Sequence, residues 1–275
     1  MYRNKLGKRC GRACALVAMA ALLLAGLWVW AEGAVWPNAS GKTTYKKSGA
    51  VVDASHAEDG YIMAKYKPSK KKLKARVAQG DTAYQYDQNG RGDYEVYSLQ
   101  MGAGKYKLQL YEQVKGSRYA PKASVSFSVK EMREHAPFLC PNQYIWYTED
   151  SQAVAKSLEL CEGLAGDMDK VSAVYKFIAG NIRYHYVRAM TVEQGYLPDV
   201  DLLLSEGQGI CFDIAALAAA MLRVQGIPTK LVIGYADRNY HAWNEVYVDG
   251  AFKRIDLTGA ITGAKPETYT AERYY

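Results

Sequence analysis

The sequence of 275 residues has little net charge once its first residues are set apart. It contains 35 lysines and arginines and 28 aspartates and glutamates, for a formal net charge of +7. Five of the basic residues lie between positions 3 and 12, and the rest of the chain has 30 basic against 28 acidic residues. Charge therefore gives no reason to expect nucleic acid as a partner, and we expect none.

Cysteine is also scarce, and repeats are absent. Beyond residue 31 the chain has only Cys140, Cys161 and Cys211, which excludes more than one disulfide bond within that part. There is no internal repeat and no low-complexity tract, so we interpret the remaining chain as ordinary globular structure.

The first 31 residues have the pattern of an export signal. A start rich in lysine and arginine precedes an apolar run from Ala13 to Ala31, whose last three residues form an acceptable cleavage site. The run is also about long enough to span a bilayer, so an uncleaved membrane anchor is the alternative. In both cases we expect the rest of the protein to be extracellular or at the cell surface. Contact with the membrane is expected only if residues 1–31 are not cleaved.

Residues 39–130 predict an all-β domain. Short segments with alternating polar and apolar residues are separated by turn sequences such as Asn89-Gly90. About seven strands at this spacing are typical of a β-sandwich of immunoglobulin-like size. The basic stretch from Lys67 to Arg76 is interpreted as a solvated edge or loop, with binding of anionic wall polymers as the alternative.

A linker is predicted for residues 131–142, and a second domain of the α+β class is predicted for residues 143–275. Two amphipathic helices are expected first, followed by an irregular approach to Cys211. Beyond a long helix, the segments 229–236, 241–248 and 251–258 are rich in β-branched and aromatic residues and predict strands. We therefore expect a helical part packed on an antiparallel sheet.

Cys211 is the first candidate for a reactive residue. The sequence after it is rich in alanine and leucine and ends at Gly226 and Pro228, so a buried helix is predicted to begin at the cysteine. The free N–H groups and positive dipole of a helix start favour a thiolate and can hold an oxyanion. For a cysteine judged alone, a small buried structural residue is the alternative.

His241 and Asp256 complete a possible catalytic set. Asp249-Gly250 predicts a hairpin turn between the last two strands. The resulting register places His241 opposite Thr258 and makes His241 and Asp256 diagonal neighbours on one face, roughly 7–8 Å apart. Asp256 can then fix the tautomer of the imidazole while the other ring nitrogen faces Cys211.

These segments resemble the core of the bacterial transglutaminase-like superfamily, which belongs to the papain-type group of Cys-His-Asp enzymes. The likeness is carried by GICFDIAALAAAMLRVQGIPTKLVIGYA and YHAWNEVYVDGAFKRIDLTG and covers roughly residues 140–260. It implies a papain/transglutaminase-like fold in which Cys211 is the nucleophile, His241 the general base and acid, and Asp256 the orienting carboxylate. The sequence departs from the family pattern at Leu257 and Phe252, where proline and tryptophan are usual.

The resemblance also implies a second oxyanion donor besides the N–H of Cys211. Tyr184 and Gln208 are the candidates. No acidic calcium loop is present, so neither a metal nor a cofactor is expected. A disulfide between Cys140 and Cys161 is predicted if Cys211 stays free in an oxidising compartment, and two unpaired buried thiols are the alternative.

Together these features predict an exported cysteine-nucleophile enzyme that forms a thioester from amide bonds of proteins or peptides, such as cell-wall or surface proteins. Water would make it a deamidase or peptidase, and a lysine-type amine would make it a transglutaminase. Acyl transfer to small amines is a further hypothesis that keeps the same chemistry and changes the substrate. The alternative in another class is a non-catalytic surface or wall binding protein that retains the fold.

Overall fold

The computed structural model describes residues 33–275. The predicted export signal or anchor in residues 1–31 lies outside the described residues. From residue 31 onward the chain forms one unit, so the predicted boundary between two domains stays a prediction. No helix within residues 33–275 is long and apolar enough to cross a membrane.

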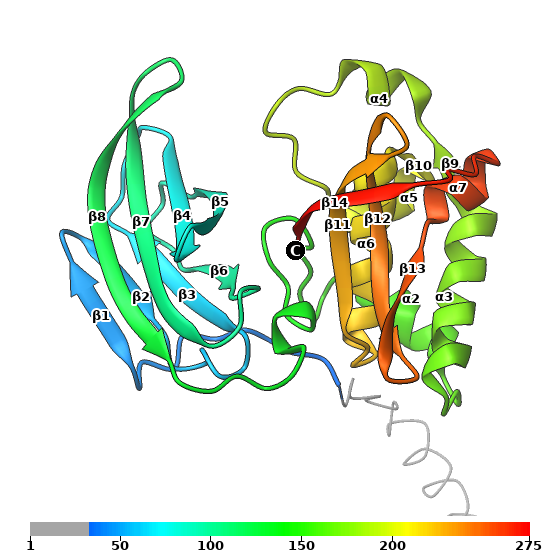
Figure 1. Ribbon diagram of the computed structural model, residues 1–275, viewed down its shortest axis with the longest axis horizontal. Coiled ribbons are helices and arrows are strands. Elements are labelled where there is room, and N and C mark those ends of the chain that lie inside the picture. Colours follow the sequence, from blue (N-terminus) through cyan, green and yellow to red (C-terminus); the bar gives the residue numbers. More distant parts are fainter. Residues whose placement is uncertain (1–32) are drawn as a thin grey trace, which may run out of the picture. The chain divides into compact units, whose positions relative to one another are not determined.

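The N-terminal β region, residues 44–129, consists of two four-stranded antiparallel sheets (Figure 1). One sheet has the order β1 (Thr44–Lys47), β2 (Ala50–Asp53), β3 (Tyr61–Tyr66) and β6 (Glu95–Ser98). The other has the order β5 (Thr82–Gln88), β4 (Leu73–Gln79), β7 (Gly104–Lys115) and β8 (Arg118–Val129). Alternate side chains of both sheets, for example Val52, Val77 and Leu108, are buried in one hydrophobic core. This arrangement confirms the predicted sandwich.

The predicted linker, residues 131–142, is folded rather than extended. It contains a short 3-10 helix, η1 (Ala136–Phe138). The ring of His135, which precedes this helix, lies 4.1 Å from the ring of Tyr247. Cys140 is fully buried, and its Sγ donates to the carbonyl oxygen of Asp59. The segment therefore packs against residues on both sides of it in the sequence.

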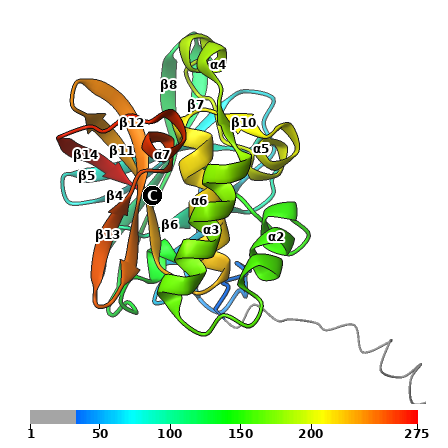
Figure 2. The same ribbon diagram turned by 90° about the vertical axis from the view of Figure 1, so that its right-hand side faces the viewer.

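The C-terminal region, residues 143–275, has the predicted α+β architecture (Figure 2). Its helices are α2 (Gln152–Cys161), α3 (Asp167–Asn181), α4 (Tyr186–Thr191), α5 (Val200–Glu206), α6 (Cys211–Val224) and α7 (Leu257–Thr262). Its antiparallel sheet has the order β13 (Ala251–Ile255), β12 (Asn239–Val248), β11 (Thr229–Ala236) and β14 (Tyr269–Tyr274). A short parallel pair joins β9 (Arg183–Tyr184) to β10 (Gln208–Gly209).

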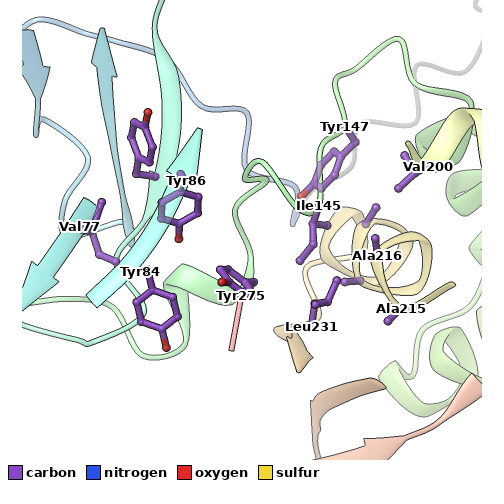
Figure 3. Close-up of a cluster of buried hydrophobic side chains, with 14 of the residues drawn as sticks. Val77, Tyr84, Tyr86, Ile145, Tyr147, Val200, Ala215, Ala216, Leu231 and Tyr275 are labelled. Carbon is purple, nitrogen blue, oxygen red and sulfur yellow. The ribbon is translucent and has the colours of Figure 1, made fainter. Parts of the chain in front are cut away.

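Helix α6 is the centre of this region. It contacts β11 and β12 on one side and α2, α3 and α5 on others. Every residue from Asp213 to Val224 is buried, as expected for a helix that is apolar on all faces. Alanines 215 and 216 belong to the same buried cluster as Leu231 of β11 and Tyr275 (Figure 3). The cysteine at the start of α6 is therefore held by a rigid, fully packed element.

Arg223 is the largest of the fully buried side chains, and its role was not predicted. Its guanidinium donates to the carbonyl oxygens of Thr229, Tyr275 and Cys140. Burial lowers the pKa of this group to about 10. Three distant chain segments are thereby joined at the end of α6 that lies away from Cys211.

The predicted disulfide bond between Cys140 and Cys161 is not formed. Both residues are buried free thiols. Cys140 lies after η1, with its Sγ close to the carbonyl oxygens of Asp59 and Ala136, whereas Cys161 is the last residue of α2. Cys140 packs in a small buried cluster with Tyr61 and Val96, whereas Cys161 belongs to the main hydrophobic core, so the two thiols lie in separate surroundings.

Candidate active site

Cys211 is the first residue of α6, as predicted. The preceding β10 pairs with β9, which fixes the path of the chain into the helix. Gly209 in β10 is tightly enclosed, because a Cβ atom there would lie 2.6 Å from Leu203 Cδ1 and 2.9 Å from Asp213 Cβ. Only glycine fits at this close approach. The thiol of Cys211 itself is partly exposed.

Asp213 completes the start of α6 from within the helix. Its Oδ2 accepts a hydrogen bond of 2.9 Å from the N–H of Ile210, and its Oδ1 accepts one of 2.7 Å from the hydroxyl of Tyr196. Burial raises the pKa of this carboxyl, and the two hydrogen bonds act in the opposite direction. The Asp213 contact ties the segment containing Tyr196 to the helix that carries Cys211.

His241 lies in β12, and its ring is hydrogen-bonded to Asp256. The distance from His241 Nε2 to Asp256 Oδ2 is 2.9 Å. Both side chains are largely enclosed, with 13% and 10% of their surface exposed. Since Nε2 is engaged by the carboxylate, Nδ1 is the ring nitrogen left for Cys211. The structure thus brings together the imidazole and carboxylate that the sequence pattern paired.

The predicted register is right in the hairpin and wrong at its end. Glu245 lies opposite Arg254, as the predicted turn at Asp249-Gly250 requires, and the ladder ends where Asn244 pairs with Ile255. The predicted pairing of His241 with Thr258 is not formed, because residues 257–262 turn into helix α7. Asp256 is the N-cap of that helix, and its Oδ1 accepts a 2.9 Å hydrogen bond from the N–H of Gly259. The cap, not a strand pair, sets the position of the carboxylate.

Tyr269 is a member of the site that the sequence did not reveal. Its hydroxyl donates to Asp256 Oδ2 over 2.8 Å. Its ring packs edge-on against Trp243 at 5.2 Å, and the guanidinium of Arg254 lies 3.8 Å from the ring centre. Tyr269 reaches Asp256 because β14 returns to pair with β11. No local pattern near residue 269 indicates that return.

The charges in the site stabilise an imidazolium. Burial lowers the pKa of His241, but hydrogen bonds to Asp256 and Cys211, together with their charges, outweigh it and raise the pKa to about 9. For Asp256, burial opposes ionisation, whereas the hydrogen bonds from His241, Gly259 and Tyr269 favour it, and its pKa is lowered overall. At neutral pH the pair is therefore an imidazolium beside a carboxylate.

The two candidates for a second oxyanion donor are placed differently. Tyr184 lines the same cavity as Cys211 and His241. Burial, followed by the charge of Cys211, raises the pKa of Tyr184 to about 12, so its hydroxyl remains a donor. Gln208 is exposed and lines neither of the cavities that contain His241. Of the two, the geometry favours Tyr184.

Two cavities meet at His241 and Tyr184. The main cavity, of about 610 Å³, contains Cys211 and extends to β5, where Gln85 and Asp87 form part of its wall. The side cavity, of about 500 Å³, contains Asp256 and lies on the other side of His241. Cys211 lines only the main cavity, whereas the side cavity reaches His241 and Asp256. Within residues 33–275, no group of three or more histidine, cysteine, aspartate or glutamate side chains is placed to hold a metal ion.

A comparison with known protein families finds a match for the part of the chain that holds this site. Residues 154–257 match the model of the Transglutaminase-like superfamily. This part of the chain is a transglutaminase-like domain. A comparison with curated proteins finds no match.

Several solved structures are similar to this chain. A structure described as a TGase is 25% identical to this chain, with a TM-score of 0.35. The match covers 43% of this chain and 32% of the TGase, so this chain spans about a third of the length of that protein. The periplasmic domain of TgpA from Pseudomonas aeruginosa is 17% identical over 84% of this chain and 78% of its own, with a TM-score of 0.38. A proposed cysteine protease from Cytophaga hutchinsonii is 16% identical over 72% and 74%, with a TM-score of 0.39. All three TM-scores are below 0.5.

Proposed function

We propose that this protein is a cysteine-nucleophile enzyme that acts on amide bonds of proteins or peptides through a thioester intermediate. The observation that carries the proposal is the joint placement of three groups. Cys211 and His241 line one cavity, and Asp256 holds the far nitrogen of His241 at 2.9 Å. A thiol, an imidazole and an orienting carboxylate are the groups that acyl transfer by a cysteine requires.

In the first half of the reaction, the Cys211 sulfur forms a bond to the carbon of a bound carboxamide. The carbonyl oxygen becomes an oxyanion, which the N–H of Cys211 and the hydroxyl of Tyr184 stabilise. His241 Nδ1 then gives its proton to the departing nitrogen, the C–N bond breaks, and ammonia or an amine leaves. Because its pKa is raised to about 9, His241 carries this proton at neutral pH.

In the second half, a nucleophile attacks the thioester carbon and gives a proton back to His241 as the C–S bond breaks. Water yields a carboxylate, and a primary amine yields a new amide. Asp256 stays ionised throughout and keeps the ring in place through Nε2. Deamidase, peptidase and transglutaminase activities share all of these steps and differ only in the leaving group and the second nucleophile.

We further propose that the protein acts outside the cytoplasm on proteins or peptides of the cell surface or wall. The support is the basic start and apolar run of residues 1–31. Cell fractionation tests the location, and recovery of the protein only from the cytoplasmic fraction would contradict it.

Alkylation by iodoacetamide from pH 5 to 9, followed by mass spectrometry, tests the reactive pair. Cys140 and Cys161 are buried and serve as internal controls. We expect rapid labelling of Cys211 below pH 7 and slow labelling in His241→Ala. If Cys211 labels slowly, only above pH 8, and equally in the variant, the site is inert and the non-catalytic binding protein becomes the better description.

A further inference from the structure

Exposed apolar side chains gather on both walls of the cleft that holds Cys211 and His241. On one wall, Tyr186 of helix α4 is 63% exposed and lines the side cavity, and Val192, just after the helix, is 37% exposed and lines the main cavity. Val187 and Met190 of α4 are exposed as well but line neither cavity. On the other wall, the β11–β12 hairpin has Tyr235 and Tyr240, whose rings meet edge to face at 5.6 Å. Single exposed apolar residues are common on protein surfaces, but several that line the cavities of a candidate active site are a sign of a binding surface.

Helix α4 is held in place although it has no buried residue. Its N-cap is His185, whose Nδ1 accepts a hydrogen bond from the N–H of Arg188. The Arg188 guanidinium donates to Glu206 at the end of α5 over 2.7 Å. The apolar side chains of α4 are therefore displayed by an anchored helix. Figures 1 and 2 both show α4 and the β11–β12 turn at the same end of the sheet.

The two walls continue past the candidate catalytic residues in both directions. Val192 and Tyr240 line the main cavity together with Cys211, and Tyr186 and Ala236 line the side cavity together with Asp256. A substrate that ends at the reacting carboxamide would occupy only one of these cavities. The open path on both sides of His241 fits a chain that continues past the reacting group.

The charges in the main cavity do not select a charged ligand. Besides His241, two cations and three carboxylates line it together: Lys74, Arg273, Asp87, Glu193 and Glu272. A polar peptide or a small amine would also leave the apolar walls in water. The complementary ligand is a polypeptide with apolar side chains.

We propose that the cleft binds an internal segment of a protein in which apolar side chains lie on both sides of the reacting carboxamide. The α4 wall takes the apolar residue on one side, and the β11–β12 wall takes the one on the other. This inference rests on the proposed function for the reaction itself, and binding can be measured without any reaction.

Binding of two peptides to the full-length Cys211→Ala protein tests the proposal. The peptides differ only in the neighbours of a central glutamine, which are leucines in one and serines in the other. We expect the leucine peptide to bind at least about tenfold more tightly, because a hydrophobic contact of this size discriminates by that factor or more. In Tyr186→Ser with Tyr240→Ser, which removes the α4 side chain of the side cavity and the hairpin side chain of the main cavity, we expect the preference to disappear. Met168→Ser is the control, because Met168 is an exposed apolar residue of α3 outside the cleft.

Equal affinities for the two peptides, or a preference that survives in the double variant, would overturn the proposal. Two other occupants have their own signatures. Sedimentation of a dimer that dissociates in the double variant would assign the walls to a second copy of the chain. Binding of the wild type to neutral phosphatidylcholine vesicles, lost in the double variant, would assign them to a lipid surface. Preferential peptide binding with neither ammonia release nor peptide cleavage by the wild type would sustain the binding site and overturn only the proposed reaction.

Discussion

Replacing Asp256 by asparagine tests how the carboxylate controls His241. In the native site, Asp256 Oδ2 accepts hydrogen bonds from His241 and Tyr269, while Oδ1 accepts one from the N–H of Gly259. Asparagine has the same shape, and its oxygen can keep the cap on α7. Its NH2 group then lies against His241 Nε2 and makes that nitrogen an acceptor. The proton of a neutral ring moves to Nδ1, which can no longer take a proton from Cys211.

The size of the effect follows from the pKa of His241, which is about 9 against an ordinary value of 6.5. At ~1.36 kcal/mol per pH unit, the difference corresponds to about 3 kcal/mol in favour of the imidazolium. Without the carboxylate charge, only the hydrogen bond and charge of Cys211 still oppose burial, and the pKa of His241 is expected to return to near its ordinary value of 6.5. At pH 7.5 the protonated fraction of His241 would fall from about 97% to about 10% or less.

The assay is the rate of Cys211 alkylation by iodoacetamide between pH 5 and 10. We expect the rate at pH 7.5 to fall by about tenfold or more, in proportion to the lost imidazolium. Asp249→Asn is the matched control, since it removes an exposed carboxylate from the same hairpin. A variant with the rate and pH profile of the wild type would refute the reasoning.

Stability provides an independent check with a defined sign. The pKa of His241 is raised in the folded protein, so its contribution is complete below pH 6.5 and is lost as the pH rises through about 9. The pKa of Asp256 is lowered, so its contribution is lost at acid pH, as the pH falls through the lowered value. The difference in unfolding free energy between the wild type and Asp256→Asn should be largest near pH 5–6 and smaller on either side.

Three further substitutions probe the scaffold of the site. Tyr269→Phe removes the hydroxyl donor to Asp256 and keeps the ring, so we expect the free energy of unfolding, measured in urea, to fall by about 1–2 kcal/mol. We also expect the decline of Cys211 alkylation at acid pH to begin at a higher pH than in the wild type. If that decline does not move, Tyr269 is merely structural. Arg223→Met removes the donor to the buried carbonyl oxygens of Thr229 and Cys140, whereas the backbone oxygen of Tyr275 keeps the N–H of Leu231. We expect a loss of at least about 2 kcal/mol in the free energy of unfolding. A loss under about 1 kcal/mol would contradict this account. Gly209→Ala should lower the free energy of unfolding by about 1–3 kcal/mol through overpacking and slow the labelling of Cys211. Gly180→Ala in α3 is the control, because a Cβ atom there meets nothing within 4 Å, and it should have neither effect.

Local features of the sequence were sufficient for the elements that carry Cys211 and His241. The alanine- and leucine-rich run predicts α6 from its first residue, and Gly226 has the left-handed φ of 75° expected past the helix end. The strand 229–236 is observed with the predicted limits. Asp249-Gly250 predicts the hairpin register, which the pairing of Glu245 with Arg254 confirms. These outcomes depend on propensities and turn geometry within a few residues, and the sequence contains that information directly.

Contacts between distant segments were decided only by the tertiary structure. Residues 257–262 contain glycine, isoleucine and two threonines and have strand-like composition, yet they form α7 because Asp256 caps the helix. Tyr269 reaches Asp256 only through the return of β14 to β11. Arg223 was indistinguishable from any basic residue near a helix end, and Cys140 and Cys161 could not be shown to be unpaired by spacing alone. Hydrogen bonds of this kind depend on where the whole chain brings its segments, and no local pattern of residues specifies that.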